Sequence, residues 1–430
     1  MKVSACVLVV PLSLLLTVDA QAAGRAHCRD GDRGRLLRYE KVASRPTAAS
    51  VQAYFDEWVA LYQDYYLFPP DLPEGFTHGF DSYKVTYCTV DAVLPGEQTA
   101  RPTSATGMVS VPRGHGPFPT VAYQHGTSVS YYDAMSNPDI VGPIEPRGES
   151  FEGPPGDAVF AGNGFILVGA DYLGLGDSSV PRERYFHAET EASAGADLLA
   201  ASREVLADLH VRQTGDLFIF GYSQGSHAAL ALHRALQAAN VDVTGTATGG
   251  VLFDPERWFL SGLVSQTATL PIYMSLILLT YDDIYDVYRR PGDVFRQPYA
   301  TTVGDLFDMH HFWDDIVAGM PPTGRDLITP SYRRKLTTDL GEPLRVRLRQ
   351  NAVDHWRPKA PLMVFQSTDD EEAPYADALD EVAHLRRAGA DVTVETLTGF
   401  DHINTLVQIM PRVITWFRSL AERPGSTGPR

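Results

Sequence analysis

A short motif framed by two glycines constrains this chain more than any other feature. Gly221, Ser223 and Gly225 form a G-x-S-x-G pattern that directly follows an apolar run at residues 217–220. Small and apolar residues then recur at helical spacing through residues 228–236. A buried strand, this turn and a helix are together typical of a nucleophile elbow, in which the glycines leave room for a sharp turn. We therefore predict that Ser223 is a nucleophile; the alternative is that it only caps the helix.

Strands and helices alternate on both sides of this motif. Two segments at residues 80–93 and 105–112 read as an antiparallel pair of strands that precedes the alternation. Such a pattern predicts an α/β fold with a mostly parallel sheet and helices on both faces. The expected strands of the alternating part are residues 119–124, 165–171, 217–220, 249–253, 361–366 and 392–397.

A serine hydroxyl needs a base beside it, and that base needs a third group that fixes its tautomer. In sheet proteins with a G-x-S-x-G elbow, the acid follows the next-to-last strand and the histidine follows the last. Asp369 and Asp370 follow the expected strand at 361–366, and His402 follows the one at 392–397. The order Ser223, aspartate, His402 therefore predicts a catalytic triad.

On these motifs, together with His125-Gly126 after the first parallel strand, the chain resembles the α/β-hydrolase superfamily. Within it, the chain is similar to the secreted lipase and esterase group that carries a large helical cap. In such enzymes the acid commonly stands four residues before a proline; counting back from Pro374 gives Asp370, with Asp369 as the alternative. The resemblance also implies an oxyanion hole built from the backbone N–H groups of Gln224 and Thr127, with Gly126 as the alternative second donor.

The function implied is a secreted serine hydrolase that cleaves carboxylic esters through a Ser-His-Asp triad and an acyl-enzyme. Its expected partner is a small-molecule or lipid ester. A serine peptidase or an acyltransferase on the same fold, and a non-enzymatic module that keeps the fold, remain alternatives. We expect no cofactor and no metal. The candidate residues for a metal site, His310 and His311, are adjacent in the sequence, so their side chains would not share a helix face. We expect His227 to pack or cap and His384 to lie on the surface.

The first residues read as an export signal. A positive start at Lys2, an apolar stretch at residues 5–16 and small residues at 20–22 fit a cleaved signal peptide, and the stretch is too short for a membrane span. Both the extracellular space and the periplasm fit such a signal. The predicted organisation is a signal peptide at 1–22, an N-terminal extension at 23–79, an α/β-hydrolase core at 80–255 and 358–420, a helical cap or lid at 256–357 and a disordered tail at 421–430.

The net charge and the cysteine content indicate which binding partners are disfavoured and which compartment the protein occupies. The net charge of −17 disfavours nucleic acid and anionic membrane surfaces. We expect no stable membrane insertion, although the apolar cap could contact a lipid interface. Cys6 would leave with the signal peptide, so Cys28 and Cys88 are predicted to form one disulfide; two free thiols are the alternative.

Overall fold

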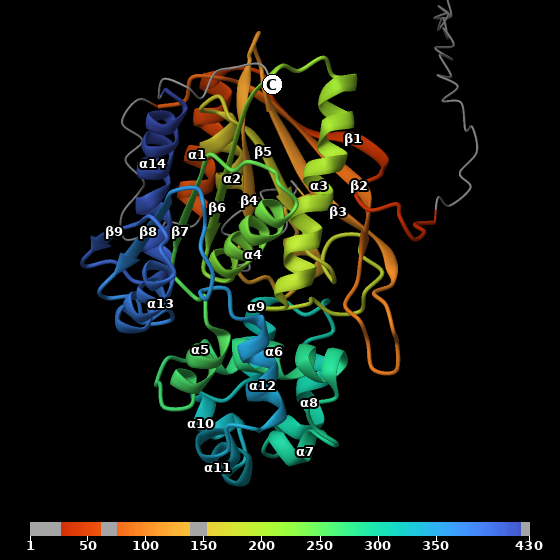
Figure 1. Cartoon of the computed structure of the whole chain (residues 1–430), viewed down its shortest axis with the longest axis vertical. Coiled ribbons are helices and arrows are strands. Elements are labelled where there is room, and N and C mark those ends of the chain that lie inside the picture. Colours follow the sequence, from red (N-terminus) through yellow and green to blue (C-terminus); the bar gives the residue numbers. More distant parts are fainter. Residues whose placement is uncertain (1–26, 62–74, 138–152, 423–430) are drawn as a thin grey trace, which may run out of the picture.

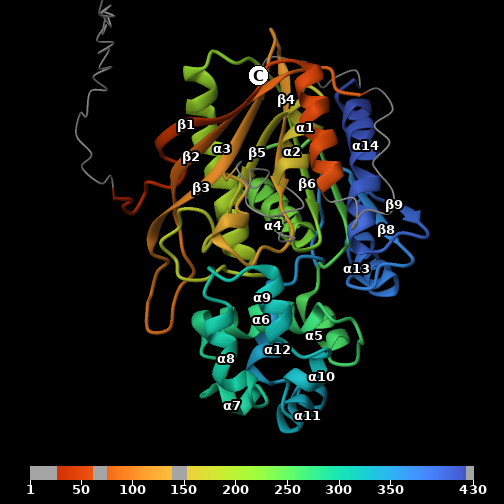
Figure 2. The same ribbon diagram turned by 180° about the vertical axis from the view of Figure 1, so that it is seen from behind.

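The computed structural model describes residues 27–61, 75–137 and 153–422, so the predicted signal peptide and most of the predicted tail lie outside the described residues. A single twisted sheet runs through the described residues, and helices pack on both of its faces (Figures 1 and 2). Its strands are β1 (Leu36–Arg45), β2 (Phe80–Val90), β3 (Pro102–Pro112), β4 (Phe118–Gln124), β5 (Ile166–Ala170), β6 (Gln213–Tyr222), β7 (Gly245–Gly249), β8 (Leu362–Ser367) and β9 (Val392–Leu397).

The strand order across the sheet is β1-β2-β3-β5-β4-β6-β7-β8-β9. The pairs β1–β2, β2–β3 and β3–β5 are antiparallel, whereas every pair from β5 to β9 is parallel. The predicted fold class, a mostly parallel sheet led by an antiparallel pair, is therefore confirmed. Because parallel strands place their carboxyl ends at one edge, the loops after β4, β6, β8 and β9 come together there.

The sequence analysis was wrong about two strands. It placed a strand at residues 249–253, but β7 ends at Gly249 and residues 250–253 are a loop that leads into the helical insertion. It also predicted no strand before residue 80, whereas β1 pairs with β2 at the edge of the sheet. Both errors concern strands whose residues do not show the apolar alternation of a half-buried strand.

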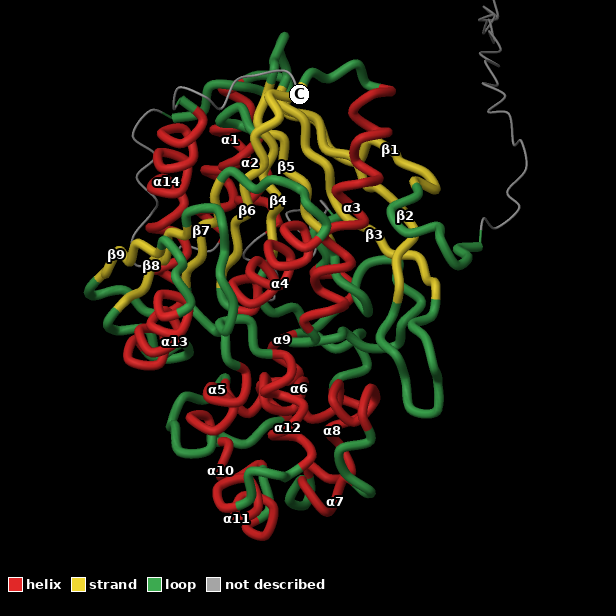
Figure 3. Tube along the Cα trace, in the orientation of Figure 1, coloured by secondary structure: helices red, strands yellow, loops and turns green. Residues whose placement is uncertain are grey.

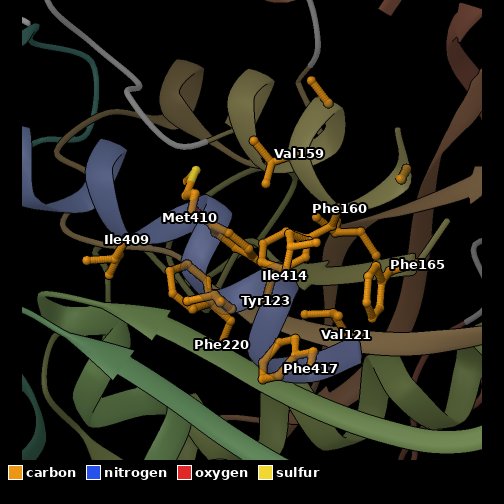
Figure 4. Close-up of a cluster of buried hydrophobic side chains, with 14 of the residues drawn as sticks. Val121, Tyr123, Val159, Phe160, Phe165, Phe220, Ile409, Met410, Ile414 and Phe417 are labelled. Atoms are coloured by element: carbon orange, nitrogen blue, oxygen red, sulfur yellow. The ribbon is translucent and has the colours of Figure 1, made fainter. Parts of the chain in front are cut away.

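Helices cover both faces of the sheet (Figures 1 and 2). On one face, an aromatic core joins the sheet to its helices (Figure 4), and Phe417 stacks on Phe218 with ring centroids 4.4 Å apart. The helices of this face are α1 (Ala48–Leu61), α2 (Gly153–Ala161) and α14 (His402–Ala421). Those of the opposite face are α3 (Ala188–Asp208), α4 (Gln224–Ala238) and α13 (Tyr375–Arg387). Tyr131–Asp133 form a 3₁₀ turn.

A group of helices inserted between β7 and β8 lies beyond one end of the sheet (Figures 1 and 3). The apolar residues of the helix at 270–285 pack into a core of this insertion, in which Ile272, Leu276 and Leu278 are fully buried. The helices of the insertion are α5 (Pro255–Gly262), α6 (Leu270–Tyr285), α7 (Pro291–Val294), α8 (Tyr299–Leu306), α9 (Trp313–Gly319), α10 (Gly324–Leu327), α11 (Pro330–Thr338) and α12 (Pro343–Asn351).

One covalent cross-link joins the start of the described chain to the sheet. Cys28 and Cys88 form a disulfide, and Cys88 lies in β2. Among the helices that the structure describes, none combines the length and the apolar character that crossing a bilayer requires.

Candidate active site

Ser223 lies in a sharp turn between the end of β6 and the first residue of α4. Its backbone has φ 56° and ψ −125°, a conformation that non-glycine residues adopt at strained turns. The two glycines of the motif are packed against backbone: a Cβ at Gly221 would lie 1.9 Å from the carbonyl oxygen of Gly225, and one at Gly225 would lie 2.0 Å from that of Gln124. Side chains at either position would therefore push the turn apart. The serine itself remains partly exposed.

His402 and Asp370 meet Ser223 from the two loops that follow β9 and β8. The hydroxyl of Ser223 lies 2.9 Å from Nε2 of His402. On the other side of the ring, Nδ1 lies 2.9 Å from both carboxylate oxygens of Asp370. The carboxylate fixes the proton on Nδ1, so Nε2 is left as the acceptor for the serine proton. The structure thus brings three sequence-predicted residues into one hydrogen-bonded line.

Both partners of the serine are held in place by backbone groups. The N–H groups of Glu372 and Ala373 donate to Oδ1 of Asp370 over 3.1 and 2.8 Å. His402 is the first residue of α14, and its carbonyl accepts a 2.5 Å hydrogen bond from the hydroxyl of Tyr222. These contacts orient the carboxylate of Asp370 and hold the backbone of His402 beside the end of β6.

The neighbouring aspartate, Asp369, does not contact His402. Its Oδ2 accepts the backbone N–H of Gly399 over 2.7 Å and the hydroxyl of Thr368, and both hydrogen bonds lower the pKa of this exposed carboxyl. Asp369 therefore ties the acid loop to the histidine loop. Of the two aspartates that the sequence left open, Asp370 has the geometry of the acid.

Of the two expected oxyanion donors, Gln224 follows Ser223 in the chain, and Thr127 lies in a loop at the same edge of the sheet. Gln224 is the first residue of α4, so its N–H has no acceptor within the helix. Thr127 stands in the loop after β4, the strand whose terminal carbonyl touches Gly225. The hydroxyl of Thr127 bonds to the hydroxyl of Tyr185 at 2.7 Å, which orients this loop. The role of both N–H groups stays a prediction.

A second carboxylate, which the sequence did not indicate, lies next to His402. Oε2 of Glu372 is 3.6 Å from Nε2 of His402, on the same side as the serine. The hydroxyls of Thr269 and Tyr273 donate to this buried carboxylate over 2.5 and 3.0 Å. Both donors belong to the helical insertion, so Glu372 links the insertion to His402. In the sequence, only its position two residues after Asp370 could have indicated that Glu372 lies at this site.

These charges change the protonation of the site. Burial alone would lower the pKa of His402, but the negative charges of Asp370 and Glu372 outweigh it and raise that pKa to about 10. Burial raises the pKa of Glu372, although the neighbouring imidazole opposes the change. Both carboxylates therefore stabilise the protonated form of His402, which a serine-attack mechanism generates when the base takes the serine proton.

A buried polar cluster lies behind the elbow. The amide nitrogen of the Gln224 side chain donates to Glu183 and Glu191 over 2.6 and 3.1 Å. His227, fully buried one turn into α4, contacts Glu191 at 2.6 Å and the carbonyl of Asn351 at 2.8 Å. The expected packing role of His227 agrees with this position, in which it connects the elbow helix to the end of α12.

The other histidines that the sequence raised lie away from the serine. His311 contacts Asp308 at 2.9 Å, and the ring of His310 packs on Tyr131. His384 is half-buried against Asp354, so its expected place on the open surface was wrong. The segment after α12 covers this face of α13, which the helical pattern of α13 alone could not indicate.

Comparisons with known proteins give relatives in structure alone. Neither a protein-family model nor a curated protein sequence matches the chain. A candidate hydrolase from Legionella pneumophila is 20% identical, with a TM-score of 0.78 over 91% of this chain and 99% of that one. The rice cell wall degrading esterase LipA from Xanthomonas oryzae is 23% identical, with a TM-score of 0.71 over 90% and 98%. Candida antarctica lipase A, in its closed state, is 15% identical, with a TM-score of 0.66 over 94% and 86%.

Identities this low establish a common fold and leave the reaction to be argued from the site. All three similar structures extend over nearly the whole chain, so the likeness includes the helical insertion as well as the sheet. Together with the sheet order and the serine turn after β6, these likenesses lead to one conclusion. The chain has the α/β-hydrolase fold, and it is similar in structure to esterases and lipases of that fold.

Proposed function

We propose that this protein is a serine hydrolase that cleaves carboxylic esters. The observation that carries the proposal is the line from Asp370 through His402 to the partly exposed hydroxyl of Ser223. Each contact in that line has the length of a normal hydrogen bond. The likeness in structure to an esterase and a lipase supports the choice of an ester as the substrate.

In the proposed reaction, Nε2 of His402 takes the proton of Ser223 while Oγ attacks the ester carbonyl. The N–H groups of Gln224 and Thr127 stabilise the resulting oxyanion. His402 then donates its proton to the leaving alcohol, and an acyl-enzyme remains on Ser223. Water, deprotonated by the same imidazole, attacks the acyl group. The tetrahedral intermediate then collapses and releases the acid, and the oxygen of Ser223 leaves and takes the proton back from His402. Asp370 stabilises the imidazolium at both stages and itself stays ionised.

Labelling with a fluorophosphonate probe and turnover of nitrophenyl esters test the proposal together. We expect the wild-type protein to be labelled and active, and Ser223→Ala to lose both properties. The exposed Ser331→Ala is the matched control and should keep both. Wild-type turnover by Ser223→Ala would contradict the proposal.

Two neighbouring activities use the same residues, a serine peptidase and an acyltransferase. A peptidase attacks an amide instead of an ester, and an acyltransferase passes the acyl group to an alcohol instead of water. The ester assay should therefore be repeated with a peptide amide as the substrate and with an alcohol added as the acceptor. Hydrolysis of the ester in preference to the amide, with the free acid as the main product, is the result we expect. A series of esters from acetate to palmitate, with and without an emulsion, then gives the acyl length.

We further propose that residues 1–22 direct export and are removed. We also propose that residues 256–357 act as a lid over a core formed by residues 80–255 and 358–420, and that this lid contacts lipid interfaces. The disulfide supports an oxidising compartment. An intact mass of the exported protein tests the cleavage site. Rates that rise when the ester forms an interface test the lid.

A further inference from the structure

Two imidazoles and one carboxylate gather where the helical insertion returns to the sheet, away from the catalytic residues. Asp354 and His355 follow α12, and His384 lies on α13. Nδ1 of His355 is 2.5 Å from Oδ1 of Asp354, and Nδ1 of His384 contacts Oδ2 of the same carboxylate. Each residue offers one ligand atom, and these three atoms lie within 4.8 Å of one another. A single small cation could contact all of them.

The carboxylate at the centre of this group is fully buried. In the described part of the chain, both ion-pair partners of Asp354 are imidazoles, and neither a lysine nor an arginine pairs with it. Buried negative charge is costly unless a cation compensates it. The junction therefore needs positive charge beside Asp354.

The two histidine rings are too close together for both to be imidazolium ions easily. Their centroids are 4.5 Å apart. Two cations at this separation repel each other, whereas two neutral imidazoles and one carboxylate can share a divalent ion. Nitrogen and oxygen ligands of this kind suit zinc and similar transition metals; magnesium and calcium prefer oxygen alone. The His355 side chain is 64% exposed, so it can rotate to admit an ion and leave a position open to water.

We propose that Asp354, His355 and His384 bind a divalent transition-metal cation of the zinc type. The expectation of no metal from the sequence missed this group, because its residues come from two segments that only the fold brings together. The ion is structural in this proposal and takes no part in ester cleavage.

The place of the site in the fold indicates what the ion does. The N–H of Val353 donates to the carbonyl of Phe253 over 2.9 Å, so the outgoing and returning ends of the insertion lie side by side. Asp354 is the next residue, and His384 belongs to the helix that follows the Asp370 loop. A bound ion would fasten the returning segment to α13 and so hold the insertion against the sheet.

Zinc binding by the full-length, oxidised protein tests the proposal. After treatment with EDTA and its removal, the protein is titrated with zinc chloride, and bound metal is measured by elemental analysis and calorimetry. We expect a single zinc ion per chain and a higher melting temperature with zinc than without. His355→Ala and His384→Ala should each lose the bound zinc and the rise in melting temperature.

Matched variants test whether zinc binding depends on these two histidines in particular and whether it is independent of ester cleavage. His311→Ala removes another imidazole that pairs with an aspartate and should keep the zinc. Ser223→Ala should also bind zinc normally, so failure of the hydrolase proposal would leave this one standing. Absence of bound zinc in the wild type, or its retention by a folded His355→Ala/His384→Ala double variant, would overturn the proposal. The exposed His355 provides a substitution that the fold tolerates.

Discussion

At the scale of the residue, the backbone of Ser223 decides where its hydroxyl points. A non-glycine residue at φ 56° and ψ −125° costs about 1–3 kcal/mol, which the surrounding contacts must offset. The backbone bond from the Ser223 N–H to the carbonyl of Gly249 provides one such contact, at 3.0 Å. The turn directs the hydroxyl toward His402 and away from the first turn of α4, which it does not cap.

The two adjacent aspartates should respond differently to the same substitution. Asp370→Asn leaves an amide that cannot hold the imidazole in the required tautomer, so kcat on a nitrophenyl ester should fall by about 10³–10⁴-fold. Asp369→Asn keeps an oxygen for the N–H of Gly399 and should change kcat by less than about tenfold. Equal losses in both variants would show that the acid had been assigned to the wrong residue.

Glu372 should set the pH dependence of the reaction. Asp370 contributes most to the raised pKa of His402, and the charge of Glu372 near Nε2 raises it further. Because only the neutral imidazole can accept the serine proton, kcat/KM should increase with pH into the alkaline range. Glu372→Gln removes that charge. The rise of kcat/KM should then move to lower pH by about one unit or more, since a charge within ~4–6 Å shifts a pKa by about 1–3 units.

A pH profile for each variant measures this effect. Asp369→Asn serves as the control, because its exposed carboxyl lies outside the set of charges that act on His402 and should leave the profile in place. A profile of Glu372→Gln that coincides with that of the wild type would mean that Glu372 is uncharged throughout the working range.

The sequence predicted the residues of the proposed triad but could not indicate Glu372. Ser223, Asp370 and His402 were predictable because the order of strands and loops fixes where each must stand. Glu372 acquires its contacts from Thr269 and Tyr273, which belong to an inserted segment with its own helical pattern. Only the packing of that segment onto the acid loop makes Glu372 part of the site.

At the scale of the element, the turn from β6 into α4 depends on glycines for space. Gly225→Ala would place a methyl group 2.0 Å from the carbonyl oxygen of Gln124, so we expect a loss of about 3 kcal/mol or more in the free energy of unfolding. Gly304 lies exposed in α8 with nothing within 4 Å of an added Cβ. Gly304→Ala should therefore stabilise the protein by about 0.5–1 kcal/mol. Urea unfolding of both variants measures the difference.

The strands that the sequence misplaced have physical reasons for their unusual residues. β7 is built from Gly245, two threonines, an alanine and Gly249, because added side chains would collide with α14: a Cβ at either glycine would lie 2.6 Å from Leu420 or Ile409. Because of this crowding, the central strand β7 lacks large apolar residues, and the apolar residues that suggested a strand lie in the loop after it. β1 carries charged residues along an edge, where they discourage pairing with other chains. β9, which begins with three β-branched residues at 392–394, was predicted with its observed bounds.

At the scale of the whole molecule, the disulfide joins residues 60 positions apart. Closing a loop of that length stabilises a fold by about 4 kcal/mol in the chain-entropy model. The double variant Cys28→Ser/Cys88→Ser should lose roughly that much free energy of unfolding in urea, yet keep its esterase rate at 25 °C because the bond lies outside the catalytic line. An unchanged unfolding midpoint would mean that the bridge does not form.

The position of the insertion between β7 and β8 also has a consequence for biosynthesis. The serine turn is translated before the inserted helices, whereas β8 and β9, which deliver the acid and the base, are translated after them. A nascent chain therefore contains its nucleophile long before anything can activate it. Under the proposed mechanism, ester cleavage can begin only when the helical insertion has been made and the last two strands have paired, so a partly translated chain would be inactive.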